Sequence, residues 1–351
     1  MPSLNIGVVA SSVSVPPTVA LNAASNYNQE LATLNATVSA NGQSTTVKFQ
    51  YSTASNFSSY TEVNAATTPI TGQAVSSYAN ITGLSTNTTY YFRCVATNDA
   101  GTTTSSSLSF TTWALQVYER STSGGTTFTI PTVTPTGGSA VAVSIYDIIM
   151  FGGGGGSESG GGGGGGYVSS NSISMTGSRS ITTSVGAGGA WGDGVYSFAA
   201  AGGNTTLSGD LTTQTAPGGG AGKSTIDIRT GSSGNGNLGG YNRYYEYSKG
   251  TAWSGKGGGG GAGSAGSDGF AGSIGGGSFA GYGGNGGSGV SITRGGVTRS
   301  GGAGGGGYGS TSNGSIGSNN SYGSGGTYNG SENNGQAGYI RFRYYAASAL
   351  A

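Results

Sequence analysis

The stretch APGGGAGKST, residues 216–225, contains the residue types from which proteins build a phosphate-binding loop. Such a loop follows the pattern G-x-x-x-x-G-K-[ST]. Its backbone N–H groups cradle the phosphates, its Lys reaches the terminal phosphate and its hydroxyl holds Mg²⁺. Gly222, Lys223 and Ser224 supply the second half, but Pro217 stands where the first glycine is needed. Because proline fixes φ and donates no N–H, we do not expect nucleotide binding here.

The remaining reactive side chains do not assemble into a recognisable catalytic site. The 351 residues include no His, one Cys and 12 Asp plus Glu. Without His, neither a Ser-His-Asp nor a Cys-His site can be built, and a single Cys allows no intramolecular disulfide and no thiolate zinc site. The carboxylates are scattered, so no acid pair of the glycosidase type stands out. We expect a non-enzymatic protein with no metal and no cofactor.

The charge pattern excludes two classes of partner. The formal net charge is +1, and Lys and Arg occur singly, so there is no basic stripe for nucleic acid. The longest apolar run, residues 140–151, is interrupted by Asp147 and is too short to span a bilayer. The first residues also lack the charged segment and apolar core of a signal peptide. The sequence predicts neither nucleic-acid binding nor membrane insertion.

The distribution of glycine divides the chain. Five of the 76 glycines lie in residues 1–113, and the other 71 lie in 114–351. Before this boundary, short stretches such as 31–40, 45–53 and 88–98 alternate apolar and polar residues, which predicts the strands of a β-sandwich. Cys94 falls on the inward face of the last of these stretches, so we expect it to be a small buried hydrophobic residue.

The segment ITGLSTNTTYYFRCVATNDAG, residues 81–101, and the terminal FTT at 110–112 resemble the fibronectin type III domain. The family's pattern is a Leu, a short polar turn, Thr-x-Tyr, alternating core residues and Ala-x-Asn-x-x-Gly. These positions are here Leu84, Thr88, Tyr90, Ala96, Asn98 and Gly101. The resemblance implies a β-sandwich in which Leu84 and Tyr90 are structural residues and the Tyr90 hydroxyl binds upstream backbone, as in a tyrosine corner. Such modules mostly act as spacers or adhesive units.

The second part alternates strand-like stretches with glycine-dense tracts at 152–166, 257–289 and 301–307. Glycine loses the most backbone entropy on folding, and such composition is otherwise typical of a flexible linker. However, strand-like stretches flank the tracts and apolar residues recur inside them. We therefore expect extended helices of the polyglycine II type, with three residues per turn and backbone hydrogen bonds between neighbouring helices.

This region also resembles the glycine-rich domain of bacteriophage tail fibres and related virion proteins. The shared elements, in order, are TTFTIP, a strand running into FGGGGGSESGGGGGGGYV, SVGAGG, GGGGGAG and GQAGYIRFRY. The chain departs from the family by reading SIYDIIMFGG where a Trp or a similar residue often precedes the first glycine run, and by an aromatic insert at 238–256. The resemblance implies a homotrimeric protein on the virion surface, made in the host cytoplasm. Since no heptad pattern is present, a trimer would form through β elements or glycine tracts.

The insert LGGYNRYYEYSKGTAWSG, residues 238–255, concentrates aromatic rings with a few polar groups. Such rings give a large contact area to a sugar or a protein surface at a small entropy cost. The alternative is that they fill space between glycine tracts or subunits. The candidate receptor contacts are the aromatic residues of the insert and three later tyrosines: Tyr241, Tyr244, Tyr245, Tyr247, Trp253, Tyr308, Tyr322 and Tyr328.

The sequence thus predicts an all-β protein with a fibronectin type III-like sandwich over 1–113, a joint over 114–125 and a glycine-rich β domain over 126–351. The expected function is that of a tail fibre or adhesin component that contacts the host surface, and the alternative is a capsid-decorating head fibre. An ice-binding protein built on polyglycine helices is a further alternative, which the irregular glycine spacing disfavours. The expected partners are further copies of the chain, other virion proteins and a host-surface glycan or protein.

Overall fold

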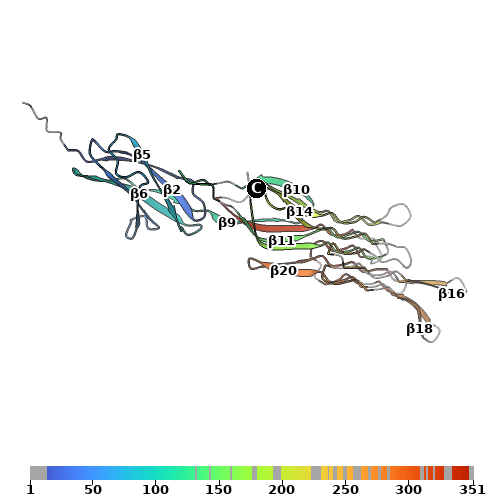
Figure 1. Ribbon diagram of the computed structural model, residues 1–351. Coiled ribbons are helices and arrows are strands. Elements are labelled where there is room, and N and C mark those ends of the chain that lie inside the picture. The colour runs from blue at the N-terminus through green and yellow to red at the C-terminus, as the bar shows by residue number, and fades with distance from the viewer. Residues whose placement is uncertain are drawn as a thin grey trace, which may run out of the picture. The chain divides into compact units, whose positions relative to one another are not determined.

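The protein is all-β, as the sequence predicts: the described residues contain 22 strands and no α-helix (Figure 1). Their contacts divide the chain into two units. Residues 1–115, 132–141 and 345–348 group in the first unit as far as they are described, and the rest form the second. The computed structural model describes residues 14–130, 133–141, 144–158, 160–175, 180–192, 199–222, 231–235, 237–239, 243–247, 251–255, 262–267, 270–275, 278–282, 285–308, 312–313, 315–318, 321–327 and 334–347.

The first unit consists of two antiparallel sheets that enclose one core. The first sheet has the order β1-β2-β5, and in the second β6 lies between β3 and the pair β7 and β8. This arrangement is that of an Ig-like β-sandwich. The strands are β1 (Thr18–Ser25), β2 (Leu31–Ser39), β3 (Thr46–Ser52), β4 (Thr61–Asn64), β5 (Val75–Thr82), β6 (Thr89–Asn98), β7 (Gly101–Thr104) and β8 (Leu108–Thr111).

Core-facing residues that largely alternate along the strands build this core. Leu34 and Val38 of β2 face Phe49 of β3 and Phe92 of β6, and all four are fully buried. Cys94 lies beside them with no exposed surface. Burial raises the pKa of the Cys94 thiol to about 12, because the thiolate would lose its hydration. Cys94 is therefore a packing residue, as its place in the alternation indicates.

The second unit has two larger sheets, with the orders β10-β13-β14-β15 and β12-β11-β22-β9, and three separate hairpins. The strands of the sheets are β9 (Ala114–Arg120), β10 (Gly124–Thr129), β11 (Ser144–Phe151), β12 (Tyr167–Ser174), β13 (Ser180–Val185), β14 (Thr205–Gly209), β15 (Gln214–Ala216) and β22 (Tyr339–Ala346). The hairpins pair β16 (Arg243–Tyr247) with β17 (Thr251–Gly255), β18 (Phe270–Gly275) with β19 (Ser278–Tyr282), and β20 (Val290–Arg294) with β21 (Val297–Gly301).

The sheet containing β11 and β22 is covered on both faces. On one face, Phe342 of β22 stacks against Tyr118 and Phe128, and Phe128 belongs to the other sheet. On the other face, Ile149 packs with Ile292 of the β20–β21 hairpin. This double covering explains why residues 148–151 are all fully buried and read as a continuous apolar run rather than an alternating one.

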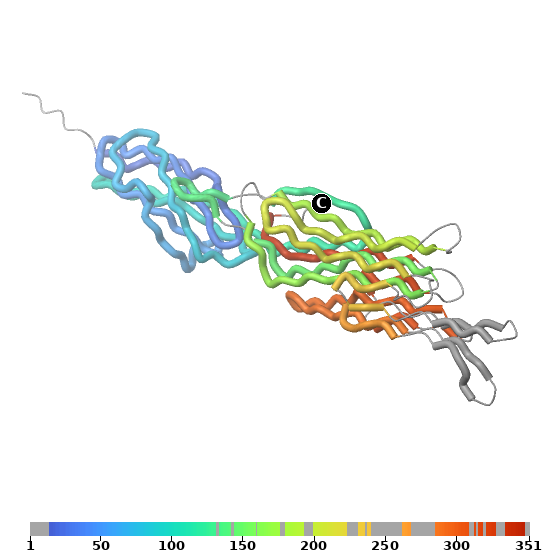
Figure 2. Tube along the Cα trace, turned by 45° about the vertical axis from the view of Figure 1, so that its right-hand side comes forward, coloured from blue at the N-terminus to red at the C-terminus, as the bar shows by residue number. Residues whose placement is uncertain are grey.

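The glycine tracts continue the strands as extended helices. Residues 152–156, the central glycine helix, bond to each neighbouring chain at intervals of three residues. The N–H groups of Gly152 and Gly155 donate to Gly166 and Gly163, for example. A repeat of three residues is the period of a polyglycine II helix. Figure 2 shows such segments running side by side from the sheets of the second unit. We call these parallel helices the glycine bundle.

Six neighbours surround the central glycine helix. Its N–H groups donate to three tracts, at 163–166, 200–203 and 336. Its carbonyl groups accept from three others, at 189, 219–222 and 326. Residues 152–156 and 160–166 are all buried. This network satisfies peptide groups that would otherwise be costly to bury. It also explains the composition, because a Cβ on Gly155 would lie 2.5 Å from the carbonyl carbon of Gly220.

The joint expected at 114–125 has a different structure. Residues 114–120 form strand β9, which pairs at the edge of the β11–β22 sheet, and residues 124–129 form β10 of the other sheet. The alternation of Gln116, Tyr118 and Arg120 with Leu115 and Val117 accounts for a strand. Its stability depends on the Tyr118 ring stacking against Phe342, a partner more than 200 residues away that no local pattern identifies.

Candidate functional site

The far end of the glycine bundle, opposite its sheets, is the candidate functional site. Here the central glycine helix passes through Ser157 and Glu158 into a tight turn, in which the Gly160 N–H donates to the Glu158 carbonyl over 2.6 Å. The chain then returns along residues 160–166. Glu158 is only 8% exposed, and the Ala199 N–H lies 3.5 Å from its Oε2. The turn is thus enclosed by neighbouring glycine helices.

Trp191 is the most exposed large aromatic residue among the described residues of this end, with 38% of its surface accessible. Its backbone N–H donates to Oδ1 of Asn334 over 2.8 Å, and the following residue, Gly192, donates to the Ser157 carbonyl. Two glycine helices distant in sequence are therefore tied together beside the turn. The exposed indole offers an apolar surface with one donor group, which suits a glycan or a protein partner.

A shallow pocket of about 230 Å³ lies next to Asn334. Its side chains are neutral and mostly polar. It is lined by Ile316, Gly325, Gly326, Thr327, Asn334 and Gln336. Together with Trp191 it forms a surface of amides, a hydroxyl and an aromatic ring, which can exchange hydrogen bonds without carrying charge.

The structure describes part of the aromatic insert. Tyr244, Tyr245, Tyr247 and Trp253 belong to the antiparallel β16–β17 hairpin, in which Tyr245 is the register partner of Trp253. This hairpin lies next to the β18–β19 hairpin. The backbone of both is described, whereas their side chains are not, and Tyr241 and Tyr328 lie outside the described residues. Receptor contact by these residues remains a prediction.

Two candidate tyrosines have described side chains. Tyr308 is half-buried and directly follows the buried tract 301–307. Tyr322 stacks on Tyr339 with ring centroids 4.3 Å apart and also stacks on Phe151. Tyr322 therefore packs against the core beside β22. Its backbone forms a bridge with Gly301, at the start of a glycine helix.

The two structural residues named from the sequence lie together in the first unit. Leu84 is 7% exposed and belongs to the core. The hydroxyl of Tyr90 accepts a hydrogen bond from the Ser85 N–H over 2.9 Å. This is the geometry of a tyrosine corner, in which the ring is buried and the hydroxyl fixes an upstream turn.

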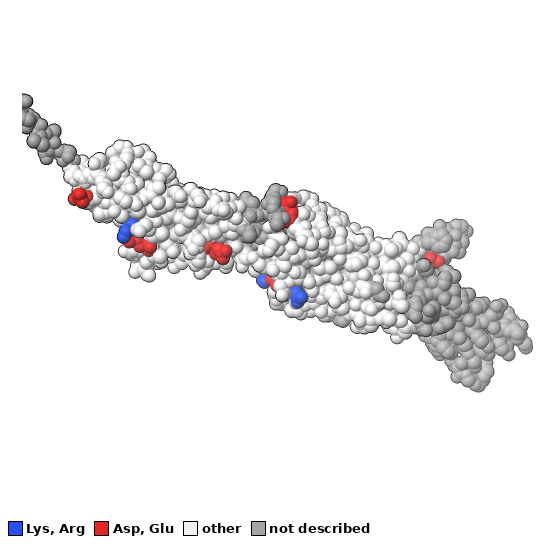
Figure 3. All heavy atoms as spheres, in the orientation of Figure 1, with Lys and Arg blue, Asp and Glu red and all other residues white. Residues whose placement is uncertain are grey.

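Ion pairs in the second unit stabilise the strands. Glu119 of β9 accepts from Arg299 of β21 over 2.7 Å, and Arg299 also donates to the Tyr339 hydroxyl over 2.9 Å. Burial alone would raise the pKa of Glu119, but hydrogen bonds from Arg299 and Tyr339 and the nearby positive charges hold it below its ordinary value. Figure 3 shows one side of the molecule, on which the coloured charged groups are few and scattered. This cluster ties a hairpin to a sheet.

The phosphate-loop look-alike is part of the glycine bundle. The N–H groups of Gly219, Gly220 and Gly222 already donate to the carbonyls of Gly153, Ser232 and Gly156. These three N–H groups are therefore not available to bind a phosphate. Lys223 and Ser224 lie outside the described residues. In the part of the chain that the structure describes, no three His, Cys, Asp or Glu residues are placed to hold a metal ion. Nor does any helix there have the length and apolar character needed to cross a membrane.

Comparisons with known proteins place the chain in no family. No protein-family model matches it, and no curated protein matches it. Among solved structures, it is similar to the sensor domain of the anti-sigma factor RsgI4 of Pseudobacteroides cellulosolvens. The two are 25% identical over 29% of this chain and 97% of the sensor domain, with a TM-score of 0.22. This likeness is too low to carry an argument about function.

The sequence analysis missed Trp191 as a surface residue. The available signal was a single large aromatic residue at the end of the glycine tract GAGGA. An aromatic residue at such a position fills a gap or reaches solvent, and only the exposed fraction of Trp191, 38% in the folded chain, decides between the two.

Proposed function

We propose that the protein is a non-enzymatic bacteriophage virion component, a tail fibre or adhesin subunit that presents the far end of its glycine bundle to the host cell surface. One observation carries the proposal. The central glycine helix is fully buried among six neighbours, with its backbone groups bonded to them. Such a network of closely packed backbone supports the residues at its end, and surface segments carried by a support of this kind commonly hold the function.

The chemistry of the described end supports adhesion rather than catalysis. Trp191, Asn334 and Gln336 are exposed and uncharged. They can make apolar contact and neutral hydrogen bonds to a surface glycan or protein, but they include no general base or nucleophile of the usual kinds. The aromatic β16–β17 hairpin adds four candidate contacts to this proposal. The first unit serves as a spacer or an attachment module.

The assembly that we propose is a homotrimer on the particle surface that contacts other virion proteins. The head fibre alternative uses the same two units with the attachment point on the capsid. An ice-binding role is less well supported, because exposed positions of the glycine bundle carry Ala187, Ala200, Gln336 and Ser315 rather than one repeated residue on a flat face.

Cryo-EM of intact particles tests the location. We expect density for the fibronectin-like unit and the glycine bundle at the tail, with the bundle pointing outward. Density on the capsid shell would replace the tail fibre by the head fibre alternative. Absence of the protein from purified particles, with host adsorption unchanged in a deletion mutant, would refute the virion proposal altogether.

Adsorption of phage carrying point variants tests the adhesive end. We expect Trp191→Ala and the double variant Tyr244→Ala with Trp253→Ala to reduce the adsorption rate at least threefold. The matched control is Tyr167→Ala, which removes an aromatic ring with 36% exposure from strand β12. Wild-type adsorption by both variants would show that these rings only pack.

A further inference from the structure

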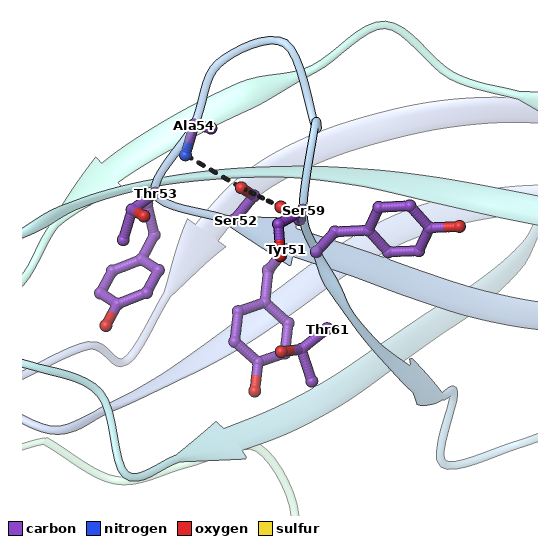
Figure 4. A pocket seen from close by; sticks show the side chains of 8 residues that line it. Tyr51, Ser52, Thr53, Ala54, Ser59 and Thr61 are labelled. Atoms are coloured by element: carbon purple, nitrogen blue, oxygen red, sulfur yellow. Dashed lines mark hydrogen bonds between the residues drawn. The ribbon is translucent and has the colours of Figure 1, made fainter.

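A second pocket lies in the first unit, where β3 leads through a loop into β4. Its volume is about 220 Å³, and none of its lining residues is charged. Three of them are tyrosines, and most of the others carry hydroxyl groups. Figure 4 shows the site, which is lined by Tyr51, Ser52, Thr53, Ala54, Ser59, Tyr60, Thr61 and Tyr90.

Hydrogen bonds within the loop hold the wall of this pocket in place. The Ser52 hydroxyl accepts from the Ala54 N–H over 2.9 Å and donates to the Ser59 carbonyl over 2.6 Å, so one side chain joins both arms of the loop (Figure 4). The Phe57 N–H donates to the Ala54 carbonyl. The loop is thus closed by its own contacts, and a ligand would not need to order it.

The buried side chain of Phe57 holds the loop on the domain. Its φ is 54°, a left-handed conformation that is costly for a bulky residue. The Phe57 side chain is buried, with only 8% of the residue exposed, and the Arg93 guanidinium lies 4.2 Å from its ring centroid. Burial and the cation–π contact compensate for the strain. Arg93 also donates to Gln50, and its guanidinium lies 5.7 Å from the centroid of the Tyr60 ring, so its charge is engaged by Phe57, Gln50 and Tyr60.

The pocket combines aromatic surface with a rim of hydroxyl groups. Tyr90 is almost buried, and its ring lies 6.3 Å from that of Tyr51. Tyr60 is 48% exposed, and the hydroxyl-bearing residues Thr61 and Ser59 are exposed as well. A pyranose ring has a matching chemistry, with an apolar C–H face and hydroxyl groups around its edge. Tyrosine rings pack against the apolar C–H face of the sugar, and Ser and Thr hydroxyls donate hydrogen bonds to its hydroxyl groups and accept hydrogen bonds from them.

We propose that this pocket binds one neutral sugar unit of a surface saccharide. The volume is below the range of 300–1,000 Å³ in which proteins bury drug-sized ligands, so it has room for a single ring. The absence of charged residues from the lining favours a hexose, a deoxyhexose or an N-acetylhexosamine over an acidic sugar. With one ring bound, the dissociation constant is about 1 mM. Several copies on one particle would strengthen such weak binding by avidity.

Saturation-transfer NMR on the full chain tests the site. The probes are glucose, galactose, mannose, rhamnose, N-acetylglucosamine and N-acetylgalactosamine, with glucuronic acid and N-acetylneuraminic acid as charged counterparts. We expect saturable transfer to at least one neutral sugar. If no neutral sugar binds, or if only the acidic sugars do, the proposal is overturned.

Variants then assign the binding to this pocket. Tyr60→Ala should weaken binding at least tenfold, whereas Tyr60→Phe keeps the ring and should stay within about twofold of wild type. Thr61→Val removes one rim hydroxyl and should weaken binding about threefold to tenfold. Tyr167→Ala, in the second unit, should have no effect. Unchanged binding by Tyr60→Ala, with the thermal midpoint preserved, would place the sugar elsewhere and refute the site. Because the sugar pocket belongs to the first unit, its failure would leave the adsorption test of the glycine bundle unaffected.

Discussion

Replacement of Gly155 by alanine tests the close-packed glycine bundle most directly. An added Cβ would lie 2.5 Å from the carbonyl carbon of Gly220 and nearer still to its oxygen. Non-bonded carbon atoms are comfortable at about 3.5–4.0 Å, so the two helices must separate by about 1 Å. The atoms in the way belong to backbone, which is itself bonded on other sides and cannot rotate aside as a side chain would.

The expected cost follows from the hydrogen bonds between these two helices. The N–H groups of Gly219 and Gly222 donate to the carbonyls of Gly153 and Gly156, each over 2.8 Å. A displacement of about 1 Å takes both beyond hydrogen-bonding distance, and each buried bond lost costs about 1–2 kcal/mol. Alanine also restricts the unfolded chain, which offsets about 0.5–1 kcal/mol. The net loss in the free energy of unfolding is then about 1–3.5 kcal/mol, or about 2–14 °C in the midpoint of a unit of this size.

Differential scanning calorimetry of the full chain measures this loss, and hydrogen-exchange mass spectrometry locates it at the amides of Gly219 and Gly222. Gly138→Ala is the matched control, since its Cβ would meet Pro135 at an ordinary 3.4 Å. Ala200→Ser controls for a change at an exposed position of the bundle. If Gly155→Ala melts within about 1 °C of wild type and both amides stay protected, the close packing described here is wrong.

Three further predictions concern other parts of the chain. Tyr90→Phe leaves the Ser85 N–H without its partner and should lower the first unit's stability in urea by about 1–2 kcal/mol; an unchanged midpoint would remove the tyrosine corner. Cys94, with a pKa of about 12, should resist iodoacetamide at pH 8 until the protein unfolds, and rapid labelling of native protein would contradict its burial. The pKa of Glu119 is lowered from 4.5, so its stabilising effect is present above about pH 4.5 and disappears as pH falls through the lower folded value; acidification should therefore lower the melting temperature of wild type more than that of Glu119→Gln.

Local patterns were sufficient to predict most of the first unit. Alternation identifies β2, β3 and β6, because each has one face in a core formed by the opposite sheet. The glycine tracts at 152–166 and 301–307 were also predictable in kind, since flanking strands and recurring apolar residues argued for order, whereas the tract at 257–289 contains the β18–β19 hairpin. Their exact neighbours were not, because each glycine helix is specified by backbone hydrogen bonds, which leave no trace in side-chain types.

The candidate site could be predicted only in part. Composition alone drew attention to the β16–β17 hairpin, but aromatic content does not separate surface contact from packing. Tyr322 shows the difficulty, because its ring stacks on Tyr339 of β22 and on Phe151 of β11, which lies far earlier in the sequence. Trp191 and the pocket beside Tyr60 were missed for a related reason: each joins residues whose proximity only the folded chain creates.

The geometry of the glycine bundle separates positions that must stay constant from positions that are free to change. Inner helices such as 152–156 admit no Cβ, because backbone of a neighbouring helix occupies that space. On an outer helix, Ala187 and Ala190 are three residues apart and both are exposed. Gly186 and Gly189 are also three residues apart on this helix, and both are buried. A polyglycine II helix thus turns every third residue towards solvent. Substitutions at such positions, and in the connections at the far end, leave the backbone network intact. On the proposed function, the surface at the far end can therefore change its specificity while the support beneath it keeps the same structure.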